Sequence, residues 1–292
     1  MKVRLKKILS VAAVVLLFIV LLALFSYYRY PWDALTVRLQ DEISSQTPYE
    51  VSIDKLRPST PVSIKVVGFK LYRKSPKSIV LNIDELKIKP SIWGLITGKL
   101  RFKFKGAAYG GTFDGKVKDI GKEQYEIDFS STNFMLNKYD YNAALAGTNA
   151  SVRLDGTMGL VVSGVADATF KNQALKGSIK AANFALLASK FSEIELPELK
   201  FASIEVPFEV KGNVLTIKPT SASGESVEAR LSGTVNLREP AARSPINLEL
   251  KLKFKGALKD SLDPFFQWVK EKDTEGFYKI EISGTLGGVK LR

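Results

Sequence analysis

The most regular feature of this chain is the alternation of apolar and polar side chains. From Leu100 to Lys105, a leucine and two phenylalanines alternate with one arginine and two lysines. From Ile246 to Phe254, five apolar side chains alternate with four polar or charged ones. A period of two places the apolar side chains on one face of a β-strand. Less regular segments rich in β-branched residues predict further strands at 51–53, 62–72, 79–88, 112–117, 125–129, 150–167, 174–183, 199–204, 208–210, 214–217, 227–237 and 277–286.

Helical signals are few and short in the same part of the chain. A helical turn is predicted at 91–96, short helices at 184–191 and 264–271, and an irregular connection or short helix within 133–148. So few helices leave most of one apolar sheet face to be covered by another sheet or by a ligand. We therefore predict a mainly β body over 49–292, a curved and mostly antiparallel sheet that forms a trough or an incomplete barrel. A closed sandwich fits the periodicity equally well.

The N-terminal stretch has a different pattern, an apolar run without alternation. Residues 8–25 carry no charge and one polar side chain, Ser10. A run of about 18 apolar residues is long enough to span a bilayer as a helix. We predict a transmembrane anchor at 8–28 and a basic tip at 1–7 that stays in the cytoplasm, because positive residues favour that side. A cleaved secretory signal is the alternative, although its apolar core is usually shorter.

An amphipathic helix is predicted directly after the anchor, at 31–45. Pro31 and Asp33 suit a helix N-terminus. Trp32, Leu35, Leu39 and Ile43 then recur at helical spacing on one face. Such a stripe either lies on the membrane surface or packs under the β body, and packing is the more common outcome.

A glycine recurs inside several of the predicted strands. The shared form is an apolar residue, Asp or Ser, Gly, Thr or Lys, and a second apolar residue. It occurs at 113–117, 154–158, 231–235 and 282–286. Glycine within a strand marks a bulge, a bend or a close backbone approach, and recurrent bends curve a long sheet.

Composition and charge narrow the function. The chain has no Cys and no His, which excludes thiol nucleophiles, disulfides and the common zinc sites. We predict no enzyme activity, no catalytic residue, no cofactor and no metal. The net charge is +13, and five of the cationic residues precede Asp33. A basic body outside the cytoplasm favours anionic lipid over nucleic acid as a partner, although lysines also protect exposed sheet edges.

Several short motifs follow one another along the chain: YPWDAL at 30–35, YEVSI at 49–53, LRP at 56–58, the Gly-Gly segment within 107–115, the strand pair at 224–237 and ISGTL at 282–286. Their order resembles the type II secretion system protein N (GspN) family. More loosely, the chain is similar to AsmA-like proteins, in which an inner-membrane anchor carries a groove of β-strands. These resemblances imply a single-pass inner-membrane protein with a periplasmic body. For the secretion family they imply a non-enzymatic accessory role beside other type II secretion proteins.

The second functional hypothesis is lipid handling in an apolar groove. The most regular strands would line it with their apolar face, and phospholipid or lipopolysaccharide would be the ligand. The alternative for the same side chains is an ordinary protein core, which is what alternating strands usually build. The candidate groove residues are Phe102, Phe104, Leu248, Leu250, Leu252 and Phe254.

Overall fold

The computed structural model describes most of the chain after residue 24. The described residues are 17–18, 21–22, 25–46, 49–59, 62–74, 78–141, 150–167, 172–187, 189–191, 194–196, 198–238, 243–256, 258–260, 272–286 and 288–291. The predicted basic tip, most of the predicted anchor and the predicted helix at 264–271 lie outside them. Among the described residues, no helix combines the length and apolar character needed to cross a membrane.

The fold is dominated by one antiparallel sheet of 14 strands, in which almost every strand pairs with its nearest neighbours in sequence. This confirms the prediction of a mainly β, antiparallel body with few helices. The N-terminal half contains β1 (Tyr49–Ser59), β2 (Ser63–Arg73), β3 (Ser78–Pro90), β4 (Arg101–Ala108), β5 (Gly111–Gly121), β6 (Gln124–Met135) and β8 (Leu154–Asp167). The C-terminal half contains β9 (Ala174–Leu186), β12 (Leu199–Lys211), β13 (Val214–Ser223), β14 (Val227–Asn236), β15 (Pro245–Phe254), β16 (Tyr278–Thr285) and β17 (Gly288–Leu291).

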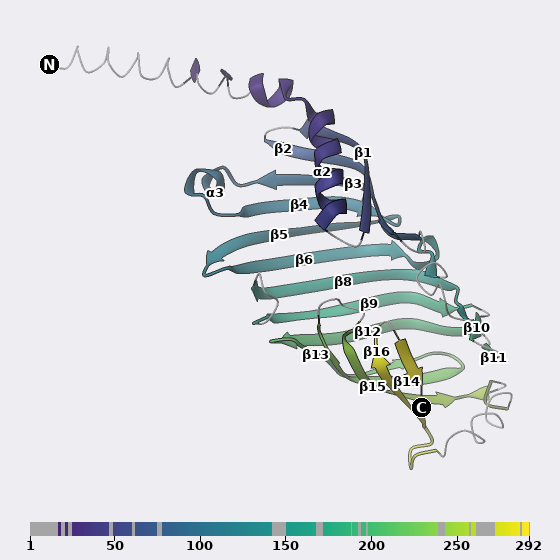
Figure 1. Cartoon of the computed structure of the whole chain (residues 1–292). Coiled ribbons are helices and arrows are strands. Elements are labelled where there is room, and N and C mark those ends of the chain that lie inside the picture. The colour runs from purple at the N-terminus through teal and green to yellow at the C-terminus, as the bar shows by residue number, and fades with distance from the viewer. Residues whose placement is uncertain are drawn as a thin grey trace.

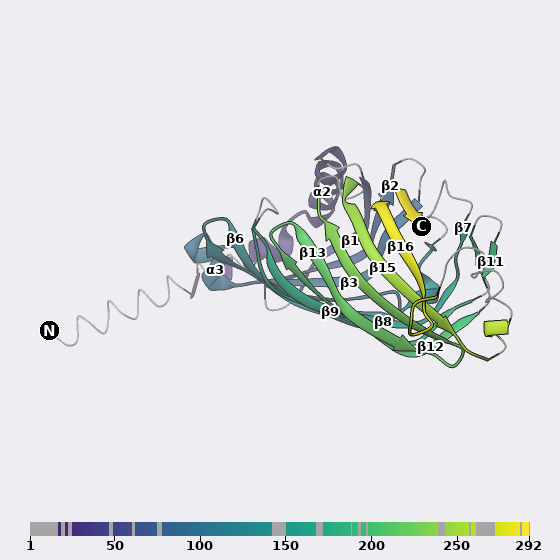
Figure 2. The same cartoon turned by 90° about the horizontal axis from the view of Figure 1, so that it is seen from below.

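The sheet is open and strongly curved. Strands β1 and β17 stand at the two ends of the strand order. Figure 1 shows the strands stacked from β1 to β12, with β14 to β16 turning forward at the lower end. Seen from below, β8, β9 and β12 lie lowest, and both β2, near one end of the strand order, and β16, near the other, lie above them (Figure 2). A small second sheet pairs β7 (Ala150–Ser151), β10 (Ser189–Phe191) and β11 (Ile194–Leu196) at one edge.

Helix α2 (Trp32–Gln46) covers the first strands. Trp32, Leu35 and Ile43 pack against a buried cluster formed by Val51, Ile53, Leu56 and Val66. The predicted amphipathic helix is therefore confirmed, in the version in which it packs on the β body. Leu39 of the predicted stripe is 36% exposed and lies at the margin of this contact.

A second buried cluster closes the other end of the sheet. It consists of Phe201, Ala222, Val227, Phe254 and Tyr278, from five strands between β12 and β16. Val227 is 0% exposed and Tyr278 is 1% exposed. The two clusters of buried hydrophobic residues thus lie at opposite ends of the strand order, and the described strands between them hold no comparable cluster.

One local prediction was wrong, and two strands differ from those predicted. The helix predicted at 184–191 is instead the end of β9 and the strand β10. Its Ala and Leu content favours a helix, but Leu186 pairs with both Leu199 and Leu154, so tertiary pairing overrides propensity. The strand predicted at 51–53 is longer in the structure, because β1 is an edge strand and tolerates Pro58. Strand β17 was not predicted.

The glycines that recur in the predicted motif lie where two backbones approach closely. A Cβ atom at Gly233 would lie 2.3 Å from the carbonyl oxygen of Asn247. A Cβ atom at Gly284 would lie 2.4 Å from the carbonyl oxygen of Gly288. Gly233 and Gly284 both have positive φ. At Gly156 the pairing register of β8 also shifts, as in a bulge. The prediction that these glycines mark close backbone approaches or bulges is therefore confirmed.

One carboxylate stabilises the turn that leads into β16. Asp273 accepts hydrogen bonds from the backbone N–H groups of Phe277 and Glu275, and its other oxygen lies 3.0 Å from Lys251 Nζ. The Phe277 hydrogen bond and then that from Lys251 lower the pKa of this carboxyl below its ordinary value. A depressed pKa stabilises the fold above the ordinary aspartate pKa, and this contribution is lost as the pH falls through the folded-state value.

We therefore expect Asp273→Asn to lower the melting temperature at pH 7. The variant keeps an oxygen acceptor but loses the charge, so the difference from wild type should shrink as the carboxyl of the wild type becomes protonated. Thermal unfolding followed by circular dichroism over a pH series measures this, with Asp114→Asn, an exposed carboxylate on β5, as control. A difference that stays constant down to acidic pH would contradict the assignment.

Candidate functional site

One face of the sheet carries a continuous row of apolar side chains. Directly opposed residues of an antiparallel pair project on the same side, so the pairing register identifies side chains that share a face. We call the following set the apolar row, which passes through twelve strands: Ile64, Ile88, Phe104, Gly115, Phe129, Val162, Gly177, Phe208, Ile217, Gly233, Leu248 and Ile282.

A second row beside it has the same character. It contains Phe102, Val117, Ile127, Gly164, Leu175, Val210, Leu215, Val235, Ile246 and Gly284. Because side chains two residues apart on a strand share a face, the two rows form one apolar surface.

This apolar surface is the concave face of the sheet. Helix α2 packs on it, because the cluster under α2 includes Ile64 of the apolar row. Both sides of the curved sheet rise on the side where α2 lies (Figure 2). The apolar rows therefore line the inside of the curve, and the polar side chains of the same strands point outward.

The degree of exposure distinguishes the apolar row from a packed core, whereas Val210, Val235 and Ile246 of the second row are buried. Every member of the apolar row is partly exposed, and none is buried. Ile179, on the same face of β9 as Gly177, is 36% exposed. In a closed sandwich the corresponding side chains would pack against a second layer and be buried.

The aromatic members gather near β4, β5 and β6. The ring centroids of Phe104, Phe113 and Phe129 lie 6.2–6.3 Å from one another. Phe102 lies 6.1 Å from Phe104, and Phe134 lies 6.4 Å from Phe113. Phe104 also covers Gly115, where a Cβ would lie 2.5 Å from the ring. Small and aromatic residues thus alternate along the row, which leaves the surface uneven.

All six groove residues predicted from the sequence lie on this concave face, but in two groups. Phe102 and Phe104 are on β4, and the other four are on β15. Phe104 and Leu248 belong to the same row, with seven strands between them. Phe254 is buried in the cluster near the C-terminus and Leu252 packs against that cluster, so these two serve the protein core. Leu248 and Leu250 are partly exposed.

Sequence reasoning missed the middle of this surface. Phe129, Val162 and Phe208 link the two predicted groups across the floor of the curve. Their strands were predicted, but the strand order and register that align them were not. A survey of every aromatic residue at an inward position of each predicted strand would have included Phe129.

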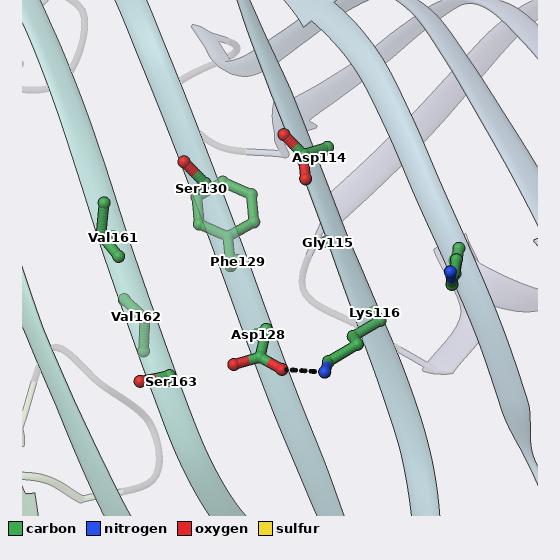
Figure 3. Close-up of a pocket in the computed structure, with 10 residues that line it drawn as sticks. Asp114, Gly115, Lys116, Asp128, Phe129, Ser130, Val161, Val162 and Ser163 are labelled. Carbon is green, nitrogen blue, oxygen red and sulfur yellow. Dashed lines mark ion pairs between the residues drawn. The ribbon is translucent and has the colours of Figure 1, made fainter.

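The convex face is polar and rich in ion pairs. Its central row contains Lys103, Lys116, Asp128, Ser163, Lys176 and Glu209. Lys116 and Asp128 point toward each other from β5 and β6, with 2.8 Å between Nζ and the carboxylate oxygen (Figure 3). This hydrogen bond raises the pKa of Lys116. A shallow depression of about 420 Å³ surrounds the pair, lined in part by Asp114, Ser130 and Ser163.

The lysines of β4 therefore lie on the face opposite the apolar rows. Among the described residues, no group of three or more acidic side chains is placed to hold a metal ion. No protein-family model, curated protein or solved structure matches this chain.

Proposed function

We propose that this protein is a non-enzymatic membrane-anchored β protein that holds lipid acyl chains in its concave face. The observation that supports this most strongly is the apolar row, which continues through twelve strands without a buried member. Apolar surface that faces water costs about 25 cal/mol per Å². A contiguous surface of this extent marks an interaction site in a soluble domain.

The dimensions suit an acyl chain. Eleven inter-strand spacings of about 4.8 Å give the row a length of roughly 50 Å. This exceeds the hydrocarbon thickness of a bilayer, about 30 Å. The trough therefore has room for the acyl chains of more than one phospholipid, or for those of a lipopolysaccharide. Its open side lets the charged headgroups remain in water.

The N-terminal sequence supports a membrane location. We propose that residues 8–28 anchor the chain in the bacterial inner membrane, with the basic tip in the cytoplasm and the β body in the periplasm. The support is the uncharged run at 8–25 and the four cationic residues that precede it. A membrane location also supplies the ligand.

The test is native mass spectrometry of the full-length protein extracted in mild detergent, followed by lipid extraction and identification. We expect phospholipid or lipopolysaccharide at a fixed molar ratio, which survives washing with detergent alone. A body that is folded by circular dichroism and free of lipid in several detergents would refute lipid binding. The class of lipid recovered distinguishes the two ligands.

A second candidate is the accessory role in type II secretion that the motif resemblance implies. One structural observation favours it: β17 pairs with β16 on one side and stands at the end of the strand order among the described residues. A free sheet edge can accept a strand from another protein. Photocrosslinking from Lys290, an exposed residue of β17, in living cells should then recover a secretion component. Unchanged secretion of all substrates after gene deletion would contradict this role.

A further inference from the structure

The loop between β3 and β4 exposes large apolar side chains that neither the fold nor the proposed trough uses. It contains the short helix α3 (Ile92–Thr97), which begins after the N-cap Ser91 and ends at Gly98. Ile92, Trp93, Leu95 and Ile96 are 61–73% exposed. Leu100, just after the helix, is 53% exposed. Only Gly94 of this helix is buried.

At 100° per residue, these four side chains span an arc of about 160° on one side of the helix, and the buried Gly94 lies on the other side. A surface helix with one apolar face suits a position flat in the interfacial region of a bilayer, with that face toward the acyl chains. Tryptophan is also typical of the boundary between lipid headgroups and acyl chains.

The charge around the loop suits an anionic bilayer. From Leu86 to Phe113 the sequence has no acidic residue and six basic ones: Lys87, Lys89, Lys99, Arg101, Lys103 and Lys105. On the neighbouring strand β5, the backbone N–H of Asp119 donates to the Leu100 carbonyl, and Asp114 lies opposite Lys105 in the register. A Lys or Arg near an anionic membrane surface adds to binding, whatever the lipid.

The position of the loop agrees with this environment. In both views α3 lies at the same end of the sheet as the described N-terminal helical residues 25–29 (Figures 1 and 2). Those residues lead into an aromatic cluster in which the ring centroids of Tyr27 and Tyr30 lie 5.3 and 5.5 Å from that of Trp32. Two segments rich in aromatic and large apolar residues thus lie at one end of the body.

We propose that α3 and Leu100 insert into the headgroup region of an anionic phospholipid bilayer as a second membrane contact. The contact fixes the orientation of the sheet relative to the membrane. It rests on the proposed membrane location of the chain, and it is independent of lipid in the trough.

The test uses Trp93 as a depth probe. The full-length chain carrying Trp32→Phe and Trp268→Phe retains Trp93 as its single tryptophan. It is reconstituted into vesicles of phosphatidylethanolamine and phosphatidylglycerol, with phospholipids brominated near the top of their acyl chains as quenchers. We expect about a twofold loss of Trp93 emission and a blue shift, as for an indole at the interface. The matched control adds Trp93→Phe and Val161→Trp, a position 47% exposed in the middle of β8, and should not be quenched.

Four outcomes are distinguished. Quenching of Trp93 alone supports the proposal, and it should weaken in the Ile92→Ser, Ile96→Ser variant. A Trp93 that is shielded from aqueous acrylamide and is not quenched by the brominated lipids means that protein covers α3, which overturns the proposal. An unquenched, solvent-exposed Trp93 in chains that float with the vesicles also overturns it. A chain that does not float with the vesicles would contradict the proposed membrane anchor. Lipid bound in the trough is measured by native mass spectrometry, in an experiment that does not depend on α3.

Discussion

Phe129→Glu is expected to remove at least about nine-tenths of the co-purifying lipid, because a carboxylate facing acyl chains loses several kcal/mol of solvation. Phe129 lies in the apolar row on the floor of the curve, within 6.2 Å of the rings of Phe104 and Phe113. It is partly exposed, so the charged side chain can reach water once the lipid has left, and the fold should survive.

Ser130→Glu is the matched control for this variant. Ser130 is the next residue of β6 and points to the convex face, beside Asp114 and Val161 in the register. The control adds the same charge to the same strand, and it should keep the wild-type lipid ratio. Native mass spectrometry of both variants measures the ratio. Equal lipid content in the two variants, with both folded, would show that the concave face does not hold the lipid.

Tyr278→Ala is expected to lower the free energy of unfolding by about 3–5 kcal/mol, the range for truncation of a large buried aromatic side chain. Tyr278 is 1% exposed and belongs to the cluster that closes the C-terminal end of the sheet. Its ring centroid lies 6.0 Å from that of Phe254, and Lys272 Nζ lies 5.0 Å above the ring. The variant leaves a cavity where five strands meet.

Ile280→Ala on the same strand is the control for the core variant. Ile280 lies on the same face as Tyr278 but is partly exposed, so its truncation should cost less than half as much. Denaturant unfolding followed by circular dichroism measures both. A Tyr278→Ala variant as stable as Ile280→Ala would mean that this cluster does not hold the end of the sheet.

The candidate site was predicted in part. Alternation in two strands identified side chains of one face, and Phe104 and Leu248 do share a row. The same pattern could not tell that Phe254 is buried in a cluster while Leu248 is partly exposed, because both occupy inward positions of β15. That difference depends on Phe201, Ala222, Val227 and Tyr278, which four other strands bring together around Phe254.

The sequence by itself determined the class of fold and the face of each strand, because a period of two is a local property of the chain. It also determined α2, α3 and the close approaches at glycines such as Gly233, since caps, stripes and missing side chains act within a few residues. Only the tertiary structure decided the strand order, the aligned apolar row and the strand that replaced the helix predicted at 184–191. Those features depend on which strands meet and in which register, and alternation specifies faces without specifying neighbours.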